Sequence, residues 1–206
     1  MNLYILRYTG PFGFIKPWTA VRDSETYSQQ FLTPSIVAGI ERKLFPELLK
    51  RDYGIYKIKR HRLSYESISE QMEVTQTRGF NKAKLDGEII YTRGSYKNKQ
   101  VVFAPIIRGV LVNPILLLCF DNMEDALEAS SQHICLARNE DMLLPDKDII
   151  VASVEEFDND EEQFSGFELI FEDIENSFLV GYNRFNSNQA MMGWLKVVGN
   201  PIKCNY

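Results

Sequence analysis

The order of strand-like and helix-like segments in residues 1–140 constrains the fold of this chain more than any other feature of its sequence. Residues 2–8 are rich in β-branched and aromatic side chains and are followed by a Gly-Pro pair, so they predict a first strand. Thr33 and Pro34 then supply a helix N-cap and a first-turn proline, and apolar residues recur through 36–48 at helical spacing. The chain is therefore expected to begin with a strand and an amphipathic helix.

The polar face of this helix and the next strand carry the first charge pattern. Glu41 falls opposite the apolar stripe of the helix, and Pro46 is expected to kink or end the helix early. Residues 55–62 alternate in period two, which predicts a half-buried strand with Lys57 and Lys59 on its outer face. We therefore expect the positive charge of this strand to be displayed and not buried.

A protruding hairpin is predicted after residues 63–87, which show no steady period. The β-rich runs 88–92 and 100–104 flank the loop 93–99, in which glycine and asparagine favour a turn and the cations favour exposure. Residues 110–120 are apolar enough for a central strand, although Pro114 must mark a bulge, an edge or the start of that strand.

A second helix and strand complete the pattern. Asn122 is a suitable N-cap for a helix over 123–130, and 134–137 predicts a short strand. The resulting βαββαβ order is that of a ferredoxin-like or RRM-like α+β fold, an antiparallel sheet backed by two helices. We expect one such domain over 1–140 with a thumb insertion at about 64–107. A C-terminal β extension over 141–206 is expected to pack on the same domain, with strands near 148–154, 167–171, 178–182 and 194–198.

The charge is unevenly distributed along the chain. Residues 1–120 contain 18 Lys and Arg against 10 Asp and Glu, a balance of +8, whereas residues 121–206 contain 5 against 18, a balance of −13; the two sum to the net charge of −5. Such polarity suits one surface for a polyanion and another that repels it or meets a basic partner. Cations alternate with aromatic residues from 78 to 108, which suits single-stranded RNA because phosphates need charges and bases need flat faces. A solvated, lysine-rich strand edge is the alternative.

Other functional classes find little support. The run 155–162 has six acidic residues in eight; a solvated loop is the usual explanation, and a calcium loop starting at Asp158 would place Gln163 where the EF-hand needs glycine. Three distant cysteines predict neither a disulfide framework nor a zinc site, and no cofactor is expected. The nucleotide-binding, zinc-protease and hydrolase motifs do not occur. The apolar stretches are too short to span a membrane and the N-terminus does not resemble a signal peptide, so we expect a cytoplasmic protein without membrane contact.

Residues 31–40, 108–114 and 133–140 together carry a resemblance to a known family. The first stretch, Phe31-Leu-Thr-Pro-Ser-Ile-Val-Ala-Gly-Ile40, is similar to the proline-containing entry into the first helix of the Cas-five family of CRISPR-associated RAMP proteins. Arg108-Gly-Val-Leu-Val-Asn-Pro114 resembles the segment that follows the family's thumb. His133-Ile-Cys-Leu-Ala-Arg-Asn-Glu140 resembles its Tyr-Leu-Gly-Arg-Ser-Glu stretch, with Cys and Ala in place of Tyr and Gly. The resemblance covers roughly residues 1–140.

This resemblance implies a non-catalytic RNA-binding subunit of a Cascade-type surveillance complex. Such a subunit holds the 5′ handle of the CRISPR RNA, locks its thumb against the adjacent Cas-seven backbone subunit and neighbours the large subunit of the complex. Together with the charge pattern, it makes Tyr96 the candidate for base stacking. The expected RNA-binding residues are Lys57, Lys59, Arg60, Arg62, Arg78, Lys82, Lys84, Arg93, Tyr96, Lys97, Lys99 and Arg108.

Two alternatives remain open. Some relatives of that family cut precursor RNA without metal, and such a reaction needs a histidine poised near neutral pH. The chain offers His61, which is close in sequence to Tyr65, and His133, which is better explained by packing or capping. The other alternative is a protein-interaction subunit that docks a basic partner through its acidic half.

Overall fold

The structure is a computed structural model of the 206-residue chain, and it describes residues 2–17, 25–52, 54–75, 83–85, 88–90, 104–183 and 187–203. The helical elements are α1 (Pro34–Leu44), the 3-10 helix η1 (Pro46–Lys50), α2 (Met123–Ser130) and α3 (Val154–Asn159). The strands are β1 (Asn2–Thr9), β2 (Phe12–Gly13), β3 (Glu25–Tyr27), β4 (Ile58–Ser64), β5 (Ser67–Thr75), β6 (Ala83–Leu85), β7 (Glu88–Ile90), β8 (Ala104–Val112), β9 (Ile115–Phe120), β10 (Ile134–Cys135), β11 (Met142–Pro145), β12 (Ile150–Ser153), β13 (Gly166–Ile170), β14 (Phe178–Asn183) and β15 (Gln189–Val198).

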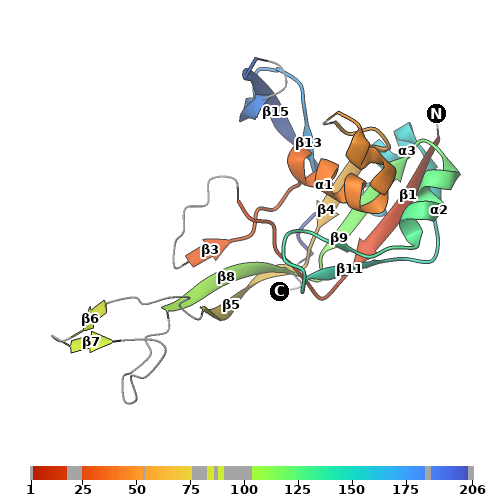
Figure 1. Cartoon of the computed structure of the whole chain (residues 1–206). Helices are drawn as coiled ribbons and strands as arrows, with labels where there is room; N and C mark the ends of the chain where they lie inside the picture. Colours follow the sequence, from red (N-terminus) through yellow and green to blue (C-terminus); the bar gives the residue numbers. More distant parts are fainter. Residues whose placement is uncertain are drawn as a thin grey trace.

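The centre of the molecule is an antiparallel sheet in which β11, β1, β9 and β4 lie side by side in that order. In chain order these are the fourth, first, third and second strands, which is the arrangement of a ferredoxin-like fold. Leu118 of β9 lies opposite Leu6 of β1 on one side and His61 of β4 on the other. The predicted α+β class is therefore confirmed, with additional strands at both edges (Figure 1).

Helices cover both faces of this sheet. Leu6 and Leu118 point toward α1 and α2 and belong to the larger apolar core. Ile5 and Leu117, one residue away on the same strands, point to the opposite face and pack with Phe157 of α3. Alternate strand residues are thus buried on both sides, which explains why β9 reads as a continuous apolar run.

The first helix forms where its sequence predicts. Thr33 is in the extended conformation at the N-cap, Pro34 occupies the first turn, and the helix ends at Leu44, two residues before Pro46. The prediction for one residue is wrong: Glu41, expected on the polar face, is fully buried. Its carboxylate accepts hydrogen bonds from the backbone nitrogens of Tyr56, at 2.9 Å, and Ile58, at 2.8 Å, and so fixes the start of β4.

A long two-stranded ribbon is inserted between the second and third strands of the central sheet. β5 and β8 pair without interruption from Ser67 opposite Val112 to Thr75 opposite Ala104. We call this pair the β5–β8 ribbon; in Figure 1 it extends away from the helices, with the small β6–β7 sheet beyond it. Near its base, β2 pairs antiparallel and β3 parallel with the other edge of β8.

The described strands of this insertion pair with partners that the sequence analysis did not predict. Residues 88–90 pair with 83–85, and 104–112 pair with 67–75, while most of the expected partnership of 88–92 with 100–104 lies outside the described residues. The predicted strand over 110–120 is two strands, because Asn113 adopts a positive φ of 47° and Pro114 follows it. β9 begins directly after Pro114, so this proline marks the start of a strand, which is one of the three roles expected for it.

The C-terminal strands extend the sheet beyond β4. Phe167 of β13 lies opposite Leu63 of β4, and β15 and β14 follow. The acidic run 155–162 is not simply a loop, because it includes most of α3. Ser153 accepts a hydrogen bond from the backbone of Glu156, whose side chain bonds back to the backbone of Ser153, a reciprocal capping box.

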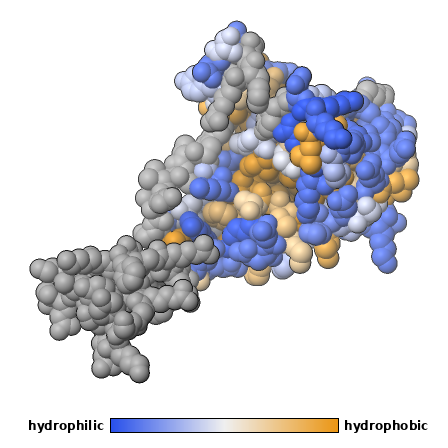
Figure 2. All heavy atoms as spheres, in the orientation of Figure 1, coloured by the Kyte–Doolittle hydropathy of each residue, from blue (hydrophilic) through white to orange (hydrophobic). Residues whose placement is uncertain are grey.

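Figure 2 shows that hydrophilic residues border an apolar area in the middle of the face that carries α1. Among the described helices, none is both long and apolar enough to cross a lipid bilayer.

Candidate functional site

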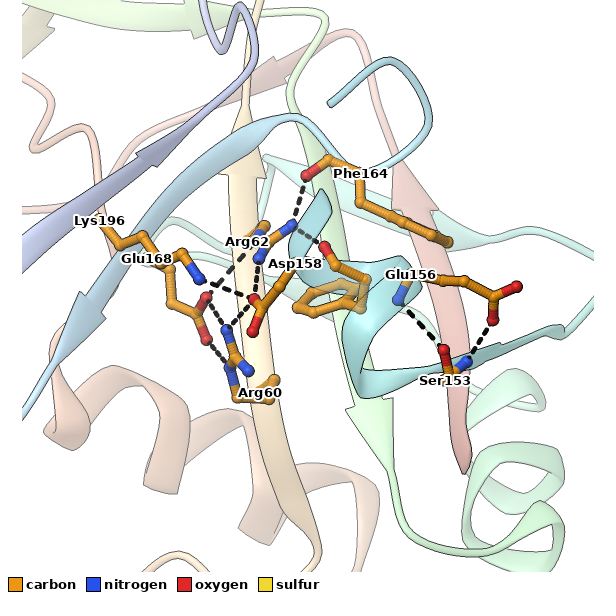
Figure 3. A network of polar contacts seen from close by, with 9 residues as sticks. Arg60, Arg62, Ser153, Glu156, Asp158, Phe164, Glu168 and Lys196 are labelled. Atoms are coloured by element: carbon orange, nitrogen blue, oxygen red, sulfur yellow. Dashed lines mark hydrogen bonds and ion pairs between the residues drawn. The ribbon is translucent and has the colours of Figure 1, made fainter. Parts of the chain in front are cut away.

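Two basic residues of β4, Arg60 and Arg62, point toward the interior of the protein. A register shift between Ile58 and Arg60 resets the alternation of the strand, so that Arg60 lies opposite Cys119 and Arg62 opposite Leu117. Both partners belong to the face of the sheet that α3 covers. Figure 3 shows the two arginines reaching from β4 toward α3, β13 and β15.

Arg62 is fully buried, and its guanidinium is surrounded by acceptors of the protein itself. Nη1 donates to the main-chain carbonyls of Phe157 and Phe164, the latter at 2.9 Å, while Nη2 donates to Asp158 at 2.8 Å. The guanidinium also lies over the ring of Phe157, 3.8 Å from its centroid. The prediction that this strand displays its charge is therefore wrong for Arg62.

Arg60 belongs to the same network. It makes a two-pronged contact with Glu168 of β13 and a further hydrogen bond to Asp158 at 2.8 Å. Lys196 of β15 also bonds Asp158, at 2.7 Å. Burial raises the pKa of Asp158, but the hydrogen bonds from Arg60 and Lys196 outweigh it and lower this pKa to about 2. The network joins three strands and α3.

Lys57 and Lys59 remain nearer the surface, yet each has carboxylate partners. Lys57 lies 2.8 Å from both Glu47 and Asp125, and its ammonium group stands over the ring of Phe45. Lys59 lies 2.9 Å from Asp121. The four expected RNA-binding cations on or beside β4, which are Lys57, Lys59, Arg60 and Arg62, thus all have carboxylate partners within the protein.

A second charged cluster holds the β5–β8 ribbon beyond its base, where Glu73 lies opposite Ile106. Glu73 of β5 contacts Arg138, at 2.7 Å, and Arg108 of β8, at 3.5 Å. Arg138 also binds Asp141 through two nitrogens, and both arginines lie over the ring of Phe14. We call these five residues the ribbon cluster. It ties the ribbon to the segment that follows β10.

The remaining predicted RNA-binding residues belong to the far part of the insertion. Lys84 lies in β6, and its side chain is not among those that the structure describes. Six further candidates fall outside the described residues: Arg78, Lys82, Arg93, Tyr96, Lys97 and Lys99.

The surroundings of His61 do not suit a general acid or base that works near neutral pH. The residue is buried, and burial lowers its pKa to about 4. Tyr65 is buried too, and its hydroxyl donates to Gln30 at 2.7 Å. His133 is exposed, and its main-chain carbonyl accepts a hydrogen bond from Lys43. Among the residues that the structure describes, no three His, Cys, Asp or Glu side chains gather as a metal site would require.

The acidic half of the network was missed by the sequence analysis. Glu168 interrupts the apolar strand β13 and is buried, with a side chain only 3% exposed. A single carboxylate inside an apolar strand predicts a buried cationic partner, because an unpaired charge there is costly. The sequence therefore contained a signal for the buried partner of Glu168. It contained no such signal for Asp158, because an acidic run does not show which of its residues lies on a short helix and faces the network.

Comparisons with known proteins give a likeness in structure. No protein-family model matches the chain, and no curated protein matches it in sequence. Among solved structures, the chain is similar to a chain described as "CRISPR RNA-guided surveillance complex", with a TM-score of 0.49 and 11% sequence identity. The similarity covers 97% of this chain and 91% of that chain.

Proposed function

We propose that this chain is a non-catalytic RNA-binding subunit of a Cascade-type surveillance complex. In this proposal it holds the 5′ handle of the CRISPR RNA and uses the β5–β8 ribbon as a thumb against a Cas-seven backbone subunit, near the large subunit and in the cytoplasm. The family resemblance of residues 31–40, 108–114 and 133–140 supports this assignment.

The proposal rests on the distribution of positive charge between the β4 region and the segment inserted between β5 and β8. Carboxylates of the domain engage the cations of β4, whereas segment 76–103, between the two strands of the ribbon, holds six Lys and Arg against two Asp and Glu. Its balance is therefore +4 in a chain whose net charge is −5. A cationic segment with interspersed aromatic residues suits single-stranded RNA.

The site assignment is narrower than the sequence alone suggests. We assign phosphate contacts to Arg78, Lys82, Lys84, Arg93, Lys97 and Lys99, and base stacking to Tyr96. Arg62 is left out because its nitrogens already bond acceptors inside the protein. Arg60 and Arg108 are each shared with carboxylates, so we give them a supporting role in holding the sheet and the ribbon.

The ribonuclease alternative has a specific weakness. General acid–base catalysis near neutral pH works best with a group whose pKa lies near the working pH. His61 is held neutral by burial, with a pKa of about 4, and its surroundings do not offer the poised imidazole that this mechanism needs.

The proposal is tested by incubating purified protein with the repeat-derived RNA in EDTA and separating the products on native and denaturing gels. We expect a shifted complex whose RNA stays intact, and co-expressed protein that purifies with RNA of one uniform 5′ end. A fixed cleavage fragment would favour the ribonuclease, and absence of a shift would contradict RNA binding altogether.

A further inference from the structure

β3 and β5 lie on either side of β8 and form with it a small sheet that has two different faces (Figure 1). Gln71 and Glu73 of β5 both contact Arg138, so the face that carries them turns toward the domain. Side chains alternate along a strand, and Glu70 and Met72 therefore lie on the opposite face. We call this opposite face the outer face of the ribbon.

On the outer face, the side chain of Tyr27 crosses β8 over Gly109. Tyr27 of β3 and Glu70 of β5 both lie opposite Gly109, one on each side of it. A Cβ atom at Gly109 would lie 2.1 Å from a ring carbon of Tyr27, so the absence of a side chain lets the ring rest on the strand. Gly109 is buried, whereas Tyr27 is 42% exposed. The strand therefore covers one side of the ring, and solvent reaches the other.

Two carboxylates meet at the hydroxyl group of Tyr27. Its oxygen lies 2.9 Å from a carboxylate oxygen of Glu25 and is also within hydrogen-bond distance of Glu70. A phenol carries one hydrogen, so it donates to one carboxylate at a time. Neither carboxylate forms an ion pair with a residue that the structure describes, whereas Glu73 on the other face contacts two arginines. Within this described part of the chain, the two negative charges of the outer face lack a compensating cation.

The surroundings of these carboxylates restrict the kind of partner that fits. Two carboxylates repel phosphate, which disfavours RNA on this face. Met72 is 69% exposed and lies opposite the half-buried Ile107, which also lies opposite Glu25, so apolar surface adjoins the charges. A cation on an apolar stem matches both features. The guanidinium group of arginine is flat, stacks on aromatic rings and offers five donors to carboxylates.

We propose that the outer face of the ribbon docks an arginine-bearing segment of a partner protein. The guanidinium lies over the open side of the Tyr27 ring and binds Glu25 and Glu70, while an apolar neighbour of that arginine packs on Met72. The choice of a neighbouring subunit as the partner rests on the proposed function, and the inference adds the face and the side chain that is recognised. The outer face and segment 76–103 then serve different partners, protein and RNA.

Capped peptides that differ in one charge provide the test. Gly-Leu-Arg-Leu-Gly is compared with the same peptide in which citrulline, similar in shape but uncharged, replaces arginine. Each peptide is titrated into the ¹⁵N-labelled full chain, and the backbone amide resonances of Gly109 and Ile107 are followed. We expect the arginine peptide to shift both resonances and to bind at least about fivefold more tightly than the citrulline peptide. Equal binding of the two peptides would overturn the proposal.

Substitutions of exposed side chains test where the peptide binds. Glu25→Gln/Glu70→Gln removes both charges and should bring the two peptides to within about twofold of each other. Glu162→Gln, at an exposed carboxylate outside the ribbon, is the control and should keep the preference for arginine. Tyr27→Leu keeps both charges but removes the ring, and should weaken binding of the arginine peptide about threefold or more. Undiminished binding in either ribbon variant would indicate general attraction to an acidic protein and would overturn the proposal.

The remaining outcomes separate this inference from the proposed function. If oligouridine RNA shifts the Gly109 resonance and the arginine peptide does not, the outer face binds nucleic acid and the inference fails. Protein that binds repeat-derived RNA but shows no preference for the arginine peptide keeps the proposed function and loses the docking surface. Protein that prefers the arginine peptide at this face and binds no RNA keeps the docking surface and loses the proposed function.

Discussion

The guanidinium of Arg62 donates a hydrogen bond from Nη1 to the main-chain carbonyl of Phe164 at 2.9 Å. This contact joins the second strand of the central sheet to the segment between α3 and β13. The same guanidinium binds Asp158 and lies against Phe157, so a side chain with a permanent charge holds the α3 face of the sheet together.

Arg62 is therefore expected to matter for stability. Arg62→Met leaves Asp158 and Glu168 with less compensation in a buried site, and we expect a loss of about 3–5 kcal/mol in the free energy of unfolding. Lys59→Met is the control, because Lys59 and Asp121 form a more exposed pair and the loss should be under about 1 kcal/mol. Urea unfolding of both variants measures this difference. Equal losses would contradict the structural role of Arg62.

Glu41 is expected to set the start of β4. Glu41→Ala removes the acceptor of several backbone N–H groups, and each buried donor left unpaired is costly, so we expect a loss of at least about 2 kcal/mol. Glu47→Ala, in the exposed pair with Lys57, should cost under about 1 kcal/mol. The comparison uses thermal or urea unfolding, and a Glu41→Ala protein as stable as Glu47→Ala would refute the assignment.

Asp158 should make the protein sensitive to acid in a defined range. Its pKa is about 2 in the folded protein and 3.8 in its ordinary state, so the folded form favours the carboxylate. The resulting stabilisation is complete above about pH 4 and is lost as the pH falls toward 2. Asp158→Asn should be less stable at neutral pH and show a smaller fall over this range, whereas the exposed Glu162→Gln should behave as the unaltered protein. Unfolding curves measured from pH 2 to 7 test this prediction. If the stability of Asp158→Asn falls as much over this range as that of the unaltered protein, Asp158 is not responsible for the fall.

The charges of Arg60 and Arg62 show the limit of sequence reasoning here. It predicts many of the helices and strands, but not which of their charged side chains are buried. The first strand, both predicted helices and the strands β4 and β9 follow from local signals such as Thr33-Pro34 and Asn122, whose side chain caps α2 by accepting a hydrogen bond from the backbone N–H of Asp125. The fourth strand of the core does not, because β11 lies beyond the predicted strand over 134–137, which forms only the two-residue edge strand β10. The register shift beside Lys59 is not visible in the sequence, and it places Arg60 and Arg62 on the face that α3 covers instead of the face of Ile58.

The β5–β8 ribbon shows a second reason why sequence reasoning fails for part of the structure. Only its end near the central sheet reaches the main core, through Leu111 and Ile68, so β5 lacks a regular buried face over its length; Met72, for example, is 69% exposed. Without burial there is no alternation of apolar and polar residues to predict the strand. The partner of each ribbon strand also depends on pairing across some 30 or more residues, which the tendencies of short segments do not determine.

Arg138 is expected to hold this ribbon against the domain through Glu73. Arg138→Met leaves Asp141, whose side chain is 4% exposed, without its two-pronged partner, and frees Glu73 of β5 from the domain. We expect a loss of about 2–4 kcal/mol, with faster hydrogen exchange in β5 and β8. Arg7→Met, which breaks an exposed pair with Asp146, serves as the control and should cost under about 1 kcal/mol. Unchanged exchange in the ribbon strands would argue against this anchoring.

The salt dependence of RNA affinity tests the central claim most directly. We propose that phosphates contact the ribbon insertion and not the β4 segment, so the slope of log affinity against log salt should shrink by about 1.4 in Lys97→Ala/Lys99→Ala, at about 0.7 for each phosphate of a single strand. Lys59→Met, in which the cation already has a carboxylate partner, should leave the slope unchanged. An unchanged slope in the double variant, together with a reduced slope in Lys59→Met, would contradict the account.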